Sequence, residues 1–174
     1  GNVQRLFDTY QYAEAGRQIL DFLWSEFADW YVEISKNALY GGQAADRERA
    51  LDVLTYVLNI SLRLLHPYMP YITEAIWGYL PTGGGPLILA RWPEADLRYL
   101  DSRAEADFAV LIDLVRGIRN ARAEYGVEPS REITALIDPG AQRVLIDTHR
   151  DMFARLCNVR QVELLAPGAA APDK

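Results

Sequence analysis

The sequence predicts a mainly α-helical fold, an antiparallel helical bundle followed by a small C-terminal α/β appendage. Apolar residues recur at helical spacing over two long stretches, prolines frame a corner between two apolar segments, and the period of the apolar residues changes after Pro129. We expect residues 1–126 to form the bundle, with a short strand or loop at 81–100. Residues 127–166 are expected to form a strand-helix-strand appendage and residues 167–174 a mobile tail.

Composition and charge limit the function classes. A chain of 174 residues that is 50% hydrophobic is long enough for one compact domain with a small addition. The formal net charge of -6 argues against a generally basic surface, although RNA affinity depends on local charge. The single cysteine, Cys157, excludes an internal disulfide and a cysteine-rich zinc site and fits a reducing, cytoplasmic setting. Because no apolar run approaches the roughly 20 residues that cross a bilayer, we expect no membrane partner.

The first long helix is predicted from Tyr12 to Lys36. Its apolar positions recur at alternating steps of three and four, at Leu20, Leu23, Phe27, Trp30 and Ile34, with Trp24 and Tyr31 widening the stripe. Such a stripe faces a core, so Trp30 is expected to pack rather than to stack on RNA bases. The chain already reads as helical at its first residues, and we expect that the start of this region is truncated.

The second long helix is predicted from a cap at Asp46 to His66, after a break at the Gly41 and Gly42 pair. Its many apolar residues predict a central position in the bundle. Pro67 clashes with a helix interior and ends this helix, while Pro70 suits the first turn of a third helix that reaches about Leu80.

The segment TGGGP at residues 82–86 predicts a plain loop, because no lysine follows it as a phosphate-binding glycine loop requires. Leu87 to Ala90 is expected to be a short strand. A further helix should start at a capping box formed by Ser102 and Glu105, continue to about Tyr125 and stop at Gly126.

The appendage follows from a change of period beyond Pro129. Ile133 to Ile137 is predicted to be a strand, Ala141 to about Leu156 a helix, and Gln161 to Leu165 a second strand.

No catalytic or metal-binding constellation is evident. His66 and His149 are far apart, and neither has a glutamate at the spacing of a metal-binding bundle. His66 stands at a helix end, where a capping or packing role is expected. Ser25 and Ser61 have no histidine nearby in sequence. We therefore assign no catalytic, cofactor-binding or metal-binding residue in this chain.

A binding constellation remains near the end of the helix predicted from Ser102. Arg116, Arg119 and Arg122 follow at steps of three and span roughly 120° of a helix surface, so they form a candidate arginine ridge for phosphates or base edges. Pairing with helix acids such as Asp113 is the alternative. Lys36 is a further candidate cation. Trp30, Tyr31 and Tyr125 are candidate aromatic platforms for RNA bases, although Trp30 fits the core stripe and is expected to pack.

Four segments, in order, resemble the helical anticodon-binding domain of class I aminoacyl-tRNA synthetases of the valine, isoleucine, leucine and methionine group. They are YAEAGRQIL with FLWSEFADWYVEISK (12–36), LLHPYMPYITEAIW (64–77), ILARWPEAD (88–96) and IRNARAEYGVEPS (118–130). Within the group they are most similar to the valine-specific members. The similarity extends to about residue 165.

The resemblance implies a helical bundle that receives the anticodon stem-loop of tRNA(Val), with the catalytic and editing domains of the same chain as further partners and no DNA or membrane partner. ATP with magnesium is expected in the complete enzyme and no cofactor in this chain, which alone should not aminoacylate. Two alternatives stay open, namely an isoleucine-specific member and a helical scaffold whose partner is a protein.

Overall fold

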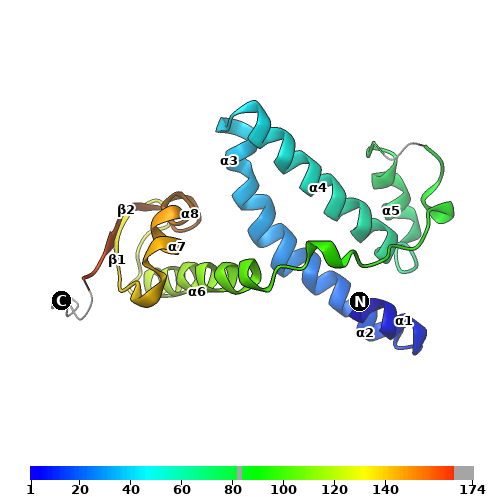
Figure 1. Cartoon of the computed structure of the whole chain (residues 1–174), viewed down its shortest axis with the longest axis horizontal. Helices are drawn as coiled ribbons and strands as arrows, with labels where there is room; N and C mark the ends of the chain where they lie inside the picture. The colour runs from blue at the N-terminus through cyan, green and yellow to red at the C-terminus, as the bar shows by residue number, and fades with distance from the viewer. Residues whose placement is uncertain (82–83, 167–174) are drawn as a thin grey trace. The chain divides into compact units, whose positions relative to one another are not determined.

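A computed structural model describes residues 1–81 and 84–166 (Figure 1). The chain folds into two compact units, Gly1–Leu97 and Arg98–Lys174, which we call unit 1 and unit 2. The mainly α-helical class is confirmed, together with a small two-stranded parallel sheet. The domain boundary predicted at residue 126 lies within unit 2 and stays a prediction. The predicted tail at 167–174 and residues 82–83 of the glycine-rich loop lie outside the described residues.

Unit 1 opens with a short helix and a long one. After α1 (Asn2–Asp8), three segments continue one another without a break: α2 (Tyr12–Asp21), the π-helix η1 (Phe22–Val32) and α3 (Glu33–Gly41). A π-helix bonds residues five apart and so has a wider turn than an α-helix. The stripe predicted with an α-helical period is accordingly broken: Trp30 is buried, whereas Trp24 is 68% exposed and does not widen a core stripe.

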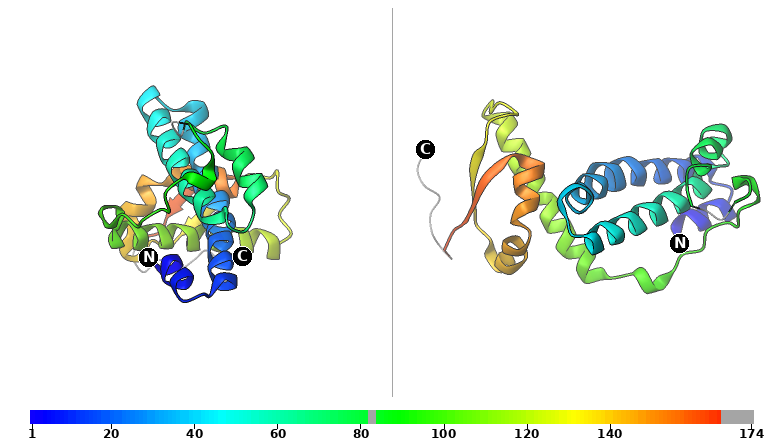
Figure 2. Two further views of the ribbon diagram at one scale, coloured as in Figure 1. Left: turned by 90° about the vertical axis from the view of Figure 1, so that its right-hand side faces the viewer. Right: turned by 90° about the horizontal axis from the view of Figure 1, so that it is seen from above.

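The helix α4 (Ala44–Leu65) runs back along the long helix and contacts both α3 and α2 (Figure 2). Gly42 permits the tight connection, because a Cβ there would lie 2.8 Å from the carbonyl oxygen of Ala38. The predicted cap at Asp46 is wrong: the helix starts two residues earlier, and the Asp46 carboxylate pairs with Arg49. Apart from Ala50, the buried residues of α4 lie near its end, so its first half is not central to unit 1.

The corner predicted from Pro67 and Pro70 is confirmed. The helix α4 ends at Leu65, and α5 (Pro70–Trp77) begins with Pro70 in its first turn. Thr73, which is 1% exposed, donates its hydroxyl hydrogen to the carbonyl oxygen of Met69 at 2.7 Å, and Nδ1 of His66 lies 2.8 Å from the same hydroxyl. His66 therefore has the expected packing role, in a hydrogen bond that closes the corner.

The strand predicted at Leu87 to Ala90 is wrong, because this segment forms a single 3-10 turn, η2 (Leu87–Leu89). The backbone nitrogen of Leu87 donates to both carboxylate oxygens of Glu74, at 2.9 and 3.1 Å. The side chain of Leu87 packs in a buried cluster with Leu62 and Trp77. The segment is thus held by α5 rather than by a neighbouring strand. A second 3-10 turn, η3 (Leu97–Tyr99), follows.

Unit 2 is built on α6 (Ser102–Glu124). Its N-cap is Asp101, whose carboxylate accepts from the backbone nitrogens of Arg103 and Ala104, so the capping box predicted at Ser102 is wrong by one residue. The predicted stop at Gly126 is confirmed, since this glycine adopts a positive φ of 60° just beyond the helix.

The strand-helix-strand order predicted from the change of period is confirmed in outline. The strands β1 (Ile133–Ile137) and β2 (Val159–Leu164) pair in parallel. The single helix expected between them is divided at His149 into α7 (Arg143–Thr148) and α8 (Arg150–Cys157), preceded by the 3-10 turn η4 (Gly140–Gln142). Buried side chains of α6 and α8, including Val115 and Phe153, form the core of this unit.

None of the helices formed by residues 1–81 and 84–166 combines the length and apolar character needed to span a membrane.

Candidate nucleic-acid interface

Arg116, the first member of the predicted arginine ridge, lies on the exposed surface of α6. Its guanidinium pairs with the carboxylate of Asp113 one turn earlier, at 3.7 Å between Nη1 and Oδ1. Both side chains are more than half exposed, and such solvated pairs contribute little to stability. Arg116 thus lies at the surface, as a ridge for RNA requires, and it also forms the ion pair with Asp113 that was predicted as the alternative to RNA binding.

Arg119 is also exposed, and it links two helices of unit 2. Its Nε donates a hydrogen bond of 3.0 Å to the carbonyl oxygen of Leu156, at the C-terminal end of α8. The last carbonyls of a helix lack partners within that helix, and a cation there also complements the helix dipole. Arg119 therefore supports the packing of α8 on α6 as well as contributing positive charge to the surface.

Arg122, the third member, is 9% exposed and has a structural position. Its Nη2 donates to the carbonyl oxygens of Glu128, Pro129 and Arg131, at 2.8, 3.2 and 2.9 Å. These bonds hold the loop between α6 and β1. A guanidinium that is buried among carbonyls is poorly placed to meet phosphates, so of the three members only Arg116 and Arg119 lie at the surface. An RNA-binding role for Arg122 stays a prediction.

Arg155, on α8, joins the basic surface although the sequence did not single it out. A cavity of about 430 Å³ is lined by residues of α6, α8 and the loop after α6, namely Arg119, Arg122, Ala123, Val127, Pro129, Arg155, Leu156, Cys157 and Asn158. This lining of described residues holds three guanidinium groups and no carboxylate. Arg155 is exposed in the last turn of α8. No sequence spacing connects it to Arg119, because only the packing of α8 on α6 brings them together.

Charge and burial oppose each other at Cys157, which lies beside these arginines. Burial raises the pKa of its thiol, and the nearby guanidiniums of Arg119 and Arg122 offset part of that rise. Its Sγ donates to the carbonyl oxygen of Val115 at 3.6 Å. The thiol is accordingly an inert packing group, as expected for a small buried residue.

The remaining predicted RNA-binding residues are Lys36 and Tyr125. Lys36, in unit 1, pairs with Glu33 at 2.6 Å on an exposed part of α3. Tyr125, just beyond the end of α6, is 58% exposed. Trp30 is buried, as expected for packing, and the ring of Tyr31 stacks on Phe27 with a centroid separation of 6.1 Å.

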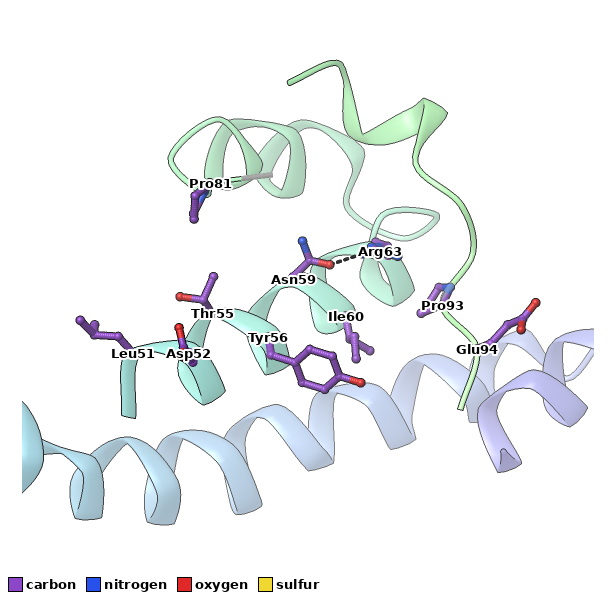
Figure 3. A pocket seen from close by; sticks show the side chains of 10 residues that line it. All are labelled: Leu51, Asp52, Thr55, Tyr56, Asn59, Ile60, Arg63, Pro81, Pro93 and Glu94. Atoms are coloured by element: carbon purple, nitrogen blue, oxygen red, sulfur yellow. Dashed lines mark hydrogen bonds between the residues drawn. The ribbon is translucent and has the colours of Figure 1, made fainter. Parts of the chain in front are cut away.

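Unit 1 contains a hollow surface along α4, which lies between this helix and the segments that carry Pro81, Pro93 and Glu94 (Figure 3). Its cavity measures about 710 Å³ and is lined by Leu51, Asp52, Thr55, Tyr56, Asn59, Ile60, Arg63, Pro81, Pro93 and Glu94. We call this cavity the α4 groove. The sequence did not predict this groove. Its walls opposite α4 come from Pro81, Pro93 and Glu94, and these residues reach α4 only because the chain turns at the corner and again at η2.

Within residues 1–81 and 84–166, no group of three or more histidine, cysteine, aspartate or glutamate residues is placed to hold a metal ion. The candidate site features of unit 2 are guanidinium groups and an exposed tyrosine, and unit 1 by itself carries the α4 groove.

Comparison with known proteins identifies the family of this chain. The family model described as the anticodon-binding domain of tRNA ligase matches residues 1–137. The chain is 37% identical to valine–tRNA ligase of Bacillus licheniformis over 90% of its own length and 18% of the relative's. It is 37% identical to that of Bacillus thuringiensis subsp. konkukian and 36% identical to that of Geobacillus stearothermophilus, each over 99% of the chain and 20% of the relative.

The chain thus spans about a fifth of the length of these curated relatives. The family model covers most of the chain, including unit 1 and all of α6. This chain therefore belongs to the family of anticodon-binding domains of tRNA ligases.

Proposed function

We propose that this chain is the part of a valine–tRNA ligase that binds the anticodon arm of tRNA(Val). The observation that carries the proposal is the agreement between the family match over residues 1–137 and the similarity to valine–tRNA ligases along nearly the whole chain. The exposed guanidiniums of Arg116, Arg119 and Arg155 supply the local positive charge that RNA requires in an acidic protein. An isoleucine-specific member and a protein-binding scaffold are not favoured.

The proposed mechanism is positional. Binding energy gathered on the anticodon arm, far from the reacting ester, helps to orient the acceptor end of the tRNA in a catalytic domain of the same protein. Phosphate contacts would fix the register of the RNA, while contacts to unpaired bases would select the cognate tRNA. The chain itself would bind no cofactor, and the catalytic domain would hold ATP with magnesium in the cytoplasm.

The antiparallel bundle and the boundary at residue 126 are part of this proposal. Limited proteolysis of the chain bound to tRNA would test them, with cutting expected near residues 126–130 and protection at 97–101. Cutting first at 97–101 would contradict the predicted boundary.

Binding of a tRNA(Val) transcript to this chain tests the function directly. We expect affinity that falls as salt rises and that exceeds the affinity for an unrelated RNA duplex of similar length. Equal affinity for both RNAs would contradict selective recognition of the anticodon arm and would favour a nonspecific surface.

A further inference from the structure

The cavity of about 430 Å³ in unit 2 has the charge of a site for a small anion. Guanidinium groups of Arg119, Arg122 and Arg155 line it, and its described lining holds no carboxylate. Because one water molecule takes up about 30 Å³, the cavity has room for a small anion together with several waters. We call this space the arginine cavity.

Half of the Arg122 guanidinium lacks a partner. Its Nη2 donates to three backbone carbonyl oxygens, whereas its Nη1 is buried and has no hydrogen-bond partner among the described residues. Buried polar atoms are nearly always hydrogen-bonded, and an exception calls for an explanation such as a bound ion. The side chain is only 9% exposed, so bulk solvent does not satisfy this donor. An acceptor for Nη1 therefore has to enter through the cavity.

Arg155 adds a guanidinium that no other residue holds. It is exposed in the last turn of α8, and within residues 1–81 and 84–166 it forms no hydrogen bond or ion pair. Arg119, in contrast, is held by its bond to the carbonyl oxygen of Leu156. One guanidinium of the cavity is thus fixed, while another is able to adjust to a ligand. The planar fork of donors on an arginine matches two oxygens of a phosphate.

The backbone dipoles near the cavity oppose an anion, but the side-chain charges outweigh them. The cavity lies where α6 and α8 end, and the C-terminal end of a helix carries about half a negative charge. Two helix ends thus amount to roughly one negative charge, against three guanidinium groups. The remaining positive charge favours a doubly charged oxyanion over chloride or a single carboxylate.

We propose that the arginine cavity binds one phosphate-type oxyanion, which accepts hydrogen bonds from Nη1 of Arg122 and from Arg155 while Arg119 provides a fixed charge beside it. Because Arg122 is buried, the anion contacts it only from inside the cavity. The oxyanion is either inorganic phosphate from solution or a phosphate of a bound RNA backbone, since both present the same oxygens. Only the second source rests on the proposed function.

Inorganic phosphate tests the site without RNA. Phosphorus NMR measures its binding to this chain directly, and labelling of the buried thiol of Cys157 with uncharged N-ethylmaleimide measures its effect on unit 2. At an ionic strength held constant with sodium chloride, we expect the labelling rate to fall by a factor of one plus the ratio of the phosphate concentration to its dissociation constant. A response that does not saturate, or that chloride reproduces, would overturn the site.

A matched pair of arginine variants separates the cavity from the net charge. Arg155→Gln removes the guanidinium that can adjust and should weaken phosphate binding by about tenfold, as expected for the loss of a charged hydrogen bond. Arg160→Gln is the control, because Arg160 is exposed on β2 of the same unit and does not line the cavity. Its phosphate affinity should equal that of the wild type. Equal weakening in both variants would show that only the charge of unit 2 attracts phosphate.

A carboxylate introduced into the cavity provides a second test. Ala123 is an exposed lining residue in the last turn of α6, where a longer side chain can be added without removing any existing contact of the arginines. Ala123→Glu should lose saturable phosphate binding, because its carboxylate pairs with the guanidiniums. Ala123→Gln adds the same bulk without charge and should keep phosphate binding. Equal phosphate affinity of these two variants would contradict an anion site.

Addition of a tRNA(Val) transcript distinguishes the two sources of the oxyanion. Release of phosphate in proportion to RNA binding would show that a backbone phosphate fills the cavity, whereas phosphate that stays bound would identify the free anion as the ligand. Either result supports the site. Phosphate binding in a chain that binds no tRNA would overturn the proposed function and leave the site. Binding of tRNA without saturable phosphate binding would overturn the site and leave the proposed function.

Discussion

Nε of Arg119 donates a hydrogen bond to the carbonyl oxygen of Leu156, at a distance of 3.0 Å. The two residues are 37 positions apart, so the bond exists only once α8 has packed on α6. Arg155, adjacent to Leu156, is placed by the same packing beside the cavity that Arg119 lines. The positive surface of unit 2 therefore depends on tertiary structure and not on one helix alone.

The exposed arginines of unit 2 should control affinity for tRNA in the complete ligase. Arg116→Ala combined with Arg155→Ala should raise the Michaelis constant for tRNA by about three- to tenfold and reduce the salt dependence of binding by about one unit of slope per arginine. Amino-acid activation without tRNA, measured by pyrophosphate exchange, should not change. Arg17→Ala with Arg49→Ala is the matched control, since both arginines pair with acids three residues earlier in unit 1. Equal effects of the two pairs would contradict a local interface.

Replacing Arg122 should change the stability of unit 2 more than the affinity for RNA. Arg122→Ala removes three hydrogen bonds to carbonyl oxygens and should lower the free energy of unfolding of unit 2 by about 2–4 kcal/mol. Cys157 is 4% exposed, so the rate at which a thiol reagent labels it reports the opening of this unit. Labelling should be much faster in Arg122→Ala and intermediate in Arg122→Lys, whose ammonium cannot reproduce the planar fork. Unchanged labelling would show that the loop does not need this guanidinium.

Thr73 should be the most sensitive position of the corner between α4 and α5. Thr73→Val keeps the shape of the side chain but removes the hydroxyl that bonds His66 and the carbonyl of Met69. Because buried groups lose their partners, Thr73→Val should lower the free energy of unfolding of unit 1 by about 1–2 kcal/mol, and Thr73→Ser should lower it by less. All four tryptophans lie within unit 1, so their fluorescence during urea unfolding measures this loss. A Thr73→Val protein as stable as the wild type would show that the corner does not need this hydroxyl.

Two helical glycines should respond to alanine in opposite directions. At Gly117 nothing lies within 4 Å of an added Cβ, and Gly117→Ala should stabilise α6 by about 0.5–1 kcal/mol. At Gly16 the Cβ would lie 3.0 Å from the ring of Tyr68, whose hydroxyl is held by the carbonyl oxygen of Tyr12 at 2.6 Å. Gly16→Ala should therefore destabilise unit 1 by about 1 kcal/mol. Cys157 labelling measures the first effect and tryptophan fluorescence the second. A gain in stability at both glycines would mean that the Tyr68 ring moves freely.

Local chemistry explains why some elements could be predicted closely. The corner at Pro67 and Pro70 and the stop at Gly126 follow from the missing proline amide and from the positive φ that glycine accepts. β1 was predicted with its observed bounds from a short, uninterrupted run of apolar and β-branched residues. Each of these signals acts within a few residues and needs no distant partner.

Other elements differ from their predictions where distant contacts decide. Leu87 was expected in a strand, but its amide is held by the carboxylate of Glu74, 13 residues earlier. Trp24 was placed on a core stripe by counting with the α-helical period, and the wider turns of η1 leave it exposed. Of the candidate site, Arg116 and Arg119 lie on the exposed surface of α6, whereas Arg122 is buried.

By itself the sequence determined the helical class, the positions of the main breaks and the set of arginines on α6, because side-chain type and spacing act along the chain. Tertiary structure alone decided that Arg122 holds a loop, that Arg155 stands beside Arg119, and that α4 carries a groove. The physical reason is that burial and hydrogen bonding depend on which segments meet in space. A guanidinium has the same chemistry at every position, and its surroundings determine whether it binds carbonyls within the fold or faces a partner outside it.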